Sequence, residues 1–104
     1  MNMLSSKSYS QFANHLDQNV QLEIMKDKLI LPKDQAINRI SKRLNSLNPV
    51  RWELVHRGES EEKEGSYLVL KAYNDQDEGV RIFLHMIELD GKKKISSIRF
   101  RKLL

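Results

Sequence analysis

The final thirteen residues, KKKISSIRFRKLL at 92–104, hold six basic side chains and no acidic one. In a β-strand, successive side chains point to opposite faces. If Ile98 and Phe100 face a core, Arg99 and Arg101 therefore stand outward, about 7 Å apart. Guanidinium groups bind carboxylates and phosphates bidentately. The sequence predicts a binding surface for an acidic partner, formed by Lys92, Lys93, Lys94, Arg99, Arg101 and Lys102.

Further basic side chains precede this stretch, in the segment KDQAINRISKRLNSLN at 33–48. Arg39 and Arg43 extend the binding surface only if this segment borders the last strand. An acidic protein surface, an anionic phospholipid and a nucleic-acid backbone all suit such a surface. Aromatic side chains on the same outward face favour single-stranded nucleic acid, because bases stack on them. Phe100 is expected to point inward, so this signature is weak.

The charges are unevenly distributed along the chain. Residues 1–50 carry a net charge of +3, residues 51–90 carry −5, and residues 91–104 carry +6. The potential that a partner experiences depends on which charges share a face. The alternative interpretation is that the basic end pairs with the acidic middle segment in a neighbouring strand.

No residue pattern indicates catalysis. The chain has no cysteine, and His15, His56 and His85 each have one nearby carboxylate, too few ligands for a metal site. His85 is expected to be a hydrogen-bonded histidine on the sheet. The four glycines form no phosphate-binding loop, and the acidic segment GESEEKEG at 58–65 is typical of a hairpin tip. We expect a protein that is not an enzyme and has no cofactor and no metal.

The elements that position the basic residues follow from hydrophobic spacing. In the segment 33–48, apolar residues recur at steps of three and four, which predicts an amphipathic helix that ends at Asn48-Pro49. The segments RWELVH, SYLVLKAY and VRIFLHMIEL alternate as strands do and are separated by turn-like residues such as Asp90-Gly91. With the basic stretch, they predict a four-stranded antiparallel meander.

The first residues are harder to interpret. Tyr9, Phe12 and Leu16 share a helical stripe, whereas Val20 and Leu22 begin an alternating pattern. A helix followed by a strand is favoured over one helix from residue 8 to about 25. The expected fold class is α+β: a four-stranded antiparallel meander packed against one long helix, plus an N-terminal helix/strand segment. We expect one domain over 1–104, with residues 1–28 as the N-terminal segment and 30–104 as helix plus meander.

Targeting signals are absent from the sequence pattern. The N-terminus lacks the apolar run of a signal peptide, and no stretch of 18 apolar residues occurs. The sequence predicts a soluble, intracellular protein, cytoplasmic or nuclear.

The order of helix, tryptophan-bearing strand, two central strands and a last strand of the form IRFRKL resembles the kinase-associated domain. That domain closes the C-termini of AMP-activated and checkpoint-type protein kinases. The resemblance covers roughly residues 30–104. It implies binding to anionic phospholipid or to a kinase domain, with Arg99, Arg101 and Lys102 as contact residues together with Arg39 and Arg43.

Three functions stay open from the sequence. The first is a non-catalytic regulatory or interaction module that binds an acidic protein surface or an anionic phospholipid through its basic C-terminal strand. The second is a small nucleic-acid-binding protein that contacts phosphates with the same strand. The third is a structural subunit that forms a homo-oligomer by pairing through the edge of the last strand and Leu103-Leu104.

Overall fold

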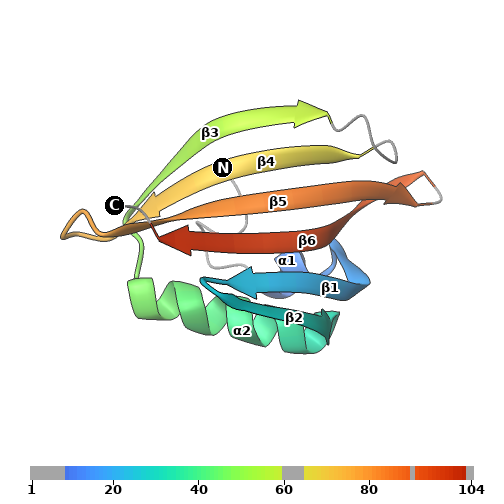
Figure 1. The fold of residues 1–104 in the computed structure, drawn as a ribbon, viewed down its shortest axis with the longest axis horizontal. Coiled ribbons are helices and arrows are strands. Elements are labelled where there is room, and N and C mark those ends of the chain that lie inside the picture. Colours follow the sequence, from blue (N-terminus) through green and yellow to red (C-terminus); the bar gives the residue numbers. More distant parts are fainter. Residues whose placement is uncertain (1–8, 60–64, 90, 103–104) are drawn as a thin grey trace.

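The computed structural model describes residues 9–59, 65–89 and 91–102. The described elements are α1 (Tyr9–Ala13), β1 (Leu16–Ile24), β2 (Asp27–Pro32), α2 (Lys33–Leu47), β3 (Arg51–Glu59), β4 (Ser66–Tyr73), β5 (Gly79–Leu89) and β6 (Lys92–Lys102). The strands form one sheet in the order β2-β1-β6-β5-β4-β3 (Figure 1). Among the described residues, no helix is long and apolar enough to cross a membrane.

The predicted four-stranded meander packed against one long helix is wrong, because the sheet has six strands and is mixed. The strands β3, β4, β5 and β6 do form an antiparallel meander. The strand expected after the N-terminal helix is β1, which forms a hairpin with β2 and pairs in parallel with β6. A single helix over residues 8–25 is also wrong, since α1 ends at Ala13. Alternation at Val20, Leu22 and Ile24 was the correct signal.

The helix α2 forms where its apolar stripe predicts it. Ala36, Ile40 and Leu44 are buried, and the helix contacts β1, β2 and α1. Asn48 ends it in the left-handed conformation (φ 53°), and its N–H donates to the Leu44 carbonyl at 2.8 Å. In Figure 1 the helix runs along the β1–β2 side of the sheet.

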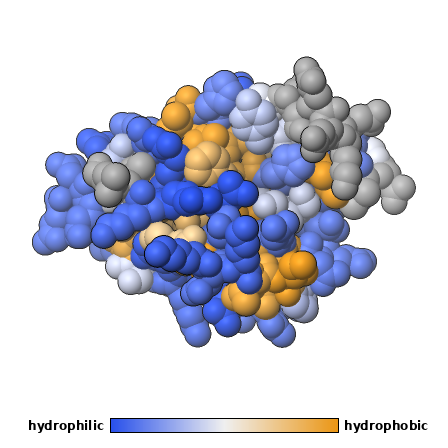
Figure 2. Space-filling view, in the orientation of Figure 1, coloured by the Kyte–Doolittle hydropathy of each residue, from blue (hydrophilic) through white to orange (hydrophobic). Residues whose placement is uncertain are grey.

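The two faces of the sheet differ in character. The core face carries Leu22, Ile82, Ile98 and Phe100, which are fully buried with the apolar side of α2. Strand alternation places the intervening residues on the opposite face, here called the open face. Figure 2 shows hydrophilic side chains across most of the visible surface, with small hydrophobic groups between them. The residues of the open face are those free to meet a partner.

Candidate anion-binding site

Three cationic residues lie side by side on the open face, near one end of strands β4, β5 and β6. Lys71 on β4 is directly opposite Arg81 on β5, and Arg81 is directly opposite Arg101 on β6. Directly opposite residues in antiparallel strands have Cβ atoms only about 5 Å apart, and like charges there are destabilising. A row of three cations is therefore an arrangement that a bound anion would stabilise.

Carboxylates stand at the two ends of this row. Glu53 on β3 is opposite Lys71. At the other end, Glu23 on β1 pairs with two arginines: its Oε2 lies 2.6 Å from Arg99 Nε, and its Oε1 lies 3.6 Å from Arg101 Nη2. Glu23 is only 8% exposed, so these two arginines offset the cost of removing its carboxylate from water. Arg81, at the centre of the row, is the one of the three cations that has neither carboxylate as a direct neighbour.

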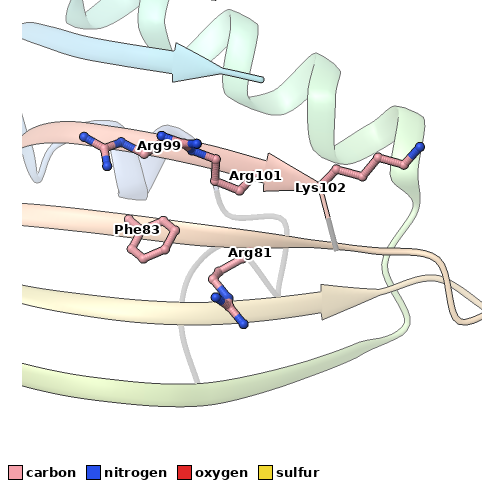
Figure 3. A pocket seen from close by; sticks show the side chains of 5 residues that line it. All are labelled: Arg81, Phe83, Arg99, Arg101 and Lys102. Carbon is pink, nitrogen blue, oxygen red and sulfur yellow. The ribbon is translucent and has the colours of Figure 1, made fainter. Parts of the chain in front are cut away.

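Arg81 has a buried polar atom that is not satisfied. Its Nε is buried and has no hydrogen-bond partner among the described residues. Figure 3 shows the Arg81 side chain extending toward β4, whereas Arg99 and Arg101 lie along β6, where they pair with Glu23 of β1. The guanidinium groups of Arg81 and Arg101 thus turn away from each other, as repulsion between like charges requires.

The space that these side chains leave is an open pocket of about 400 Å³. We call it the arginine pocket; it is lined by Arg81, Phe83, Arg99, Arg101 and Lys102 (Figure 3). Phe83 is half-buried and lies opposite Arg99 on one side and Val69 on the other. The pocket therefore combines cationic walls with one aromatic ring.

Only part of the predicted binding surface is brought together here. Ile98 and Phe100 are buried as predicted, so Arg99 and Arg101 do stand on the open face. Lys102 borders the same pocket, although Figure 3 shows its side chain extending away from the other four.

The remaining predicted residues lie elsewhere. Lys92 and Lys93 are exposed at the other end of β6, roughly 30 Å from Arg101 by the rise of a strand. Lys94 Nζ donates to the backbone oxygen of Asn14 at 2.8 Å and so ties β6 to the α1–β1 connection. Arg39 and Arg43 belong to α2, whose buried stripe packs on the core face, so they do not extend the pocket.

Arg81, Phe83 and Glu23 were missed by the reasoning from sequence. A signal for the first two existed in the alternation of VRIFLHMIEL, which sets Arg81 and Phe83 on the face opposite Ile82 and Leu84. Glu23 could not be found, because nothing local predicts that β1 pairs in parallel with β6.

The alternative that the basic end is neutralised by the acidic middle segment has limited support. Glu88 is opposite Lys93 in the β5–β6 ladder. The ion pairs of Arg99 and Arg101, however, go to Glu23, which precedes the acidic segment in the chain. Residues 60–64, which hold most of the predicted acidic hairpin tip, lie outside the described residues.

Two of the histidines, His56 and His85, form hydrogen bonds with residues of neighbouring strands. His56 Nε2 lies 2.9 Å from the Tyr67 hydroxyl, and Gly58 leaves space for that ring. The Ser96 hydroxyl donates to the His85 carbonyl at 3.3 Å and lies 3.4 Å from its Nδ1, in line with the expected hydrogen-bonded histidine. No group of three or more metal-ligating side chains is found in residues 9–59, 65–89 and 91–102.

The fold and the open face define a class of protein: a small domain built on one mixed six-stranded sheet with helices on one face. Solved structures share this fold. One is a DUF4783 family protein from Bacteroides ovatus, with a TM-score of 0.87 and 14% sequence identity over 98% of this chain and 90% of that chain. Another is a DUF4783 family protein from Bacteroides uniformis, with a TM-score of 0.86 and 15% identity over 98% of this chain and 92% of that chain. A third is a protein of unknown function with a cystatin-like fold from Methylobium petroleophilum, with a TM-score of 0.71 and 11% identity over 98% of this chain and 69% of that chain.

The chain belongs to the DUF4783 family, a domain of unknown function, whose model matches residues 1–101. No curated protein matches the chain. The expected resemblance to the kinase-associated domain is wrong. It rested on a helix followed by a meander with a basic last strand, a pattern of hydrophobic spacing that unrelated sheets share. The family match also includes the first 28 residues, which that resemblance left out.

Proposed function

We propose that this protein is a non-catalytic binding module that holds the anionic group of its partner in the arginine pocket. Carboxylates of an acidic protein and phosphates of a lipid or nucleic acid share the required chemistry, since arginine binds either one bidentately. The proposal keeps the basic last strand as a binding element and adds Arg81 from β5 to it.

One observation carries the proposal: the buried Nε of Arg81 lacks a hydrogen-bond partner among the described residues, in the middle of a row of cations. Leaving a buried donor unsatisfied is destabilising, more so for a charged group. Because Nε is fully buried, the Arg81 side chain has to shift before a bound anion can reach this atom. An anion over Arg81 would reduce the repulsion from Lys71 and Arg101 and accept hydrogen bonds from the guanidinium group. Both effects favour binding.

The absence of catalysis is part of the proposal and follows from the side chains of the pocket. Arginine stays protonated at ordinary pH and cannot exchange protons as a general acid or base does. Phe83 is apolar. The chemistry of this pocket suits holding an anion in place rather than transforming it.

Thermal unfolding in sulfate and in chloride at equal ionic strength tests the proposal. Sulfate stabilises most proteins by exclusion from their surface, so the informative quantity is the difference between variants. We expect sulfate to raise the Tm of the natural chain more than that of Arg81→Gln. At an anion concentration ten times the Kd, the extra stabilisation is about 1.4 kcal/mol.

Arg39→Gln is the matched control, because it removes the same charge from α2. It should respond to sulfate as the natural chain does. If Arg81→Gln and Arg39→Gln gain the same Tm in sulfate as the natural chain, the arginine pocket is not an anion site.

The third function considered from the sequence loses its basis. β6 lies between β1 and β5 and pairs with both, so it is not an edge strand that a second copy could extend. Leu103-Leu104 lies outside the described residues.

A further inference from the structure

We infer that the anionic partner is a single-stranded nucleic acid, whose phosphate enters the arginine pocket while a neighbouring base stacks on Phe83. This inference rests on the proposed function and names the chemical class of its ligand. It follows from the aromatic side chain of the pocket, which anion binding alone does not use.

Phe83 lies among the cations rather than apart from them. Arg99 is its direct neighbour on β6, and Arg81 is two residues before it on the same strand and face. By strand geometry, Arg81 and Phe83 are about 7 Å apart at the backbone. A ligand that fits this pocket therefore presents an anionic group and a flat group close together. A nucleotide unit has both.

A second aromatic residue of the open face, Tyr67, does not border the pocket. Tyr67 on β4 is opposite His85, and Val69 is opposite Phe83, so Tyr67 and Phe83 are diagonal neighbours on adjacent strands. Such diagonal positions are about 7–8 Å apart, within reach of long side chains. The Tyr67 hydroxyl, however, lies 2.9 Å from His56 Nε2, and its ring lies over Gly58 on β3, so the ring is turned away from Phe83. Phe83 is therefore the ring of the pocket on which a base would stack.

The two other classes of partner fit less well. A lipid surface meets side chains that protrude, whereas Phe83 is half-buried inside the pocket. An acidic peptide needs the cations but has no regular flat group to place on the ring. Base stacking, by contrast, is insensitive to sequence, because every base has a π-face.

Fluorescence anisotropy with a labelled oligothymidylate provides the test, with an abasic phosphodiester strand of equal length as the matched ligand. Both carry the same charge, and only one carries bases. We expect the natural chain to bind the oligothymidylate about tenfold more tightly, in line with one stacked base. Phe83→Leu should bring the two affinities together. Phe83→Trp should preserve the difference, which shows that the ring and not the packing of the pocket is responsible.

Arg81→Gln tests the phosphate contact in the same assay. For single strands, the slope of log K against log salt concentration changes by about 0.7 for each phosphate neutralised. We expect Arg81→Gln to lower the slope by about that amount, and Arg39→Gln to leave it unchanged.

The outcomes separate the two proposals. Equal binding of oligothymidylate and abasic strand by the natural chain overturns the inference. So does tighter binding to polyaspartate, or to vesicles containing an anionic phospholipid, at the same ionic strength. If sulfate still stabilises the natural chain more than Arg81→Gln, the arginine pocket remains an anion site with a different partner. If that difference is also absent, the proposed function fails as well.

Discussion

Arg81 and Arg101 occupy directly opposite positions on β5 and β6, and their guanidinium groups point to different sides of the pocket between them. Arg101 turns to the buried carboxylate of Glu23, and Arg81 turns toward β4. The sheet keeps two like charges in register where an apolar pair would be more stable. This arrangement makes a specific prediction for stability in the absence of any ligand.

Arg81→Met should not destabilise the protein in dilute buffer. Methionine keeps most of the aliphatic stem and removes both the repulsion and the unsatisfied Nε. We expect the free energy of unfolding in urea to rise by about 0.5 kcal/mol at low salt, and by less at high salt, where charges are screened. Arg39→Met on α2 is the control and should show no such gain. A loss of more than about 1 kcal/mol would mean that Arg81 is needed for the fold.

Glu23→Gln should have the opposite effect on stability. The carboxylate is buried and holds Arg99 and Arg101, whose side chains are 46% and 51% exposed. Because solvent screens the exposed guanidinium groups, the expected loss is about 1–2 kcal/mol in urea unfolding, less than for a fully buried pair.

The same variant should bind sulfate more tightly than the natural chain, since two guanidinium groups lose their internal anion. Glu88→Gln, an exposed site near the other end of the β5–β6 ladder, should change neither quantity. Sulfate affinity that stays constant or falls in Glu23→Gln would contradict the view that Glu23 competes with a bound anion.

Gly58→Ala should disturb Tyr67. A Cβ atom at this position would lie 2.7 Å from the Tyr67 hydroxyl oxygen and 2.8 Å from its Cζ, so the ring must move. We expect a loss of about 1–2 kcal/mol and a break of the His56–Tyr67 hydrogen bond. In a Tyr67→Ala background, the same glycine change should cost little, which a double-mutant cycle in urea measures. An equal cost in both backgrounds would place the effect in the β3 backbone.

Substituting alanine for Phe100 should reduce the free energy of unfolding more than the same change at Phe83. Phe100 has no exposed surface and packs on the core face, so Phe100→Ala should cost about 3–5 kcal/mol. Phe83 is half-buried on the open face, and Phe83→Ala should cost only about 1 kcal/mol. Thermal or urea unfolding compares them directly. Similar losses in both variants would assign Phe83 to the core and weaken its role as a stacking surface.

Local patterns were enough to predict α2 and the strands from Arg51 to Lys102. The helical spacing of apolar residues predicted that Ile40 and Leu44 are buried, and the alternation of the strands predicted the same for Ile98 and Phe100; all four are buried in the structure. These patterns work because each element contributes one apolar face to the same core. They also placed Arg99 and Arg101 on the outward face.

Non-local pairing was beyond that reasoning. β1 and β6 are more than seventy residues apart in sequence at the pair Leu22 and Ile98, and their parallel ladder brings Glu23 to Arg99. The predicted meander therefore had four strands instead of six, with the last strand at the edge of the sheet instead of inside it. The register between β5 and β6 determines which basic residues are neighbours. It places Arg101 directly opposite Arg81, and it places Lys92 and Lys93 opposite the far end of β5, away from the pocket.

The central position of β6 has a consequence for how the chain reaches its native state. The N-terminal hairpin joins the meander through β6, so the two halves of the sheet have no ladder in common until the last strand is in place. Contacts between distant segments slow folding. During refolding, both halves should therefore stay sensitive to proteases until β6 has paired, and then become resistant together.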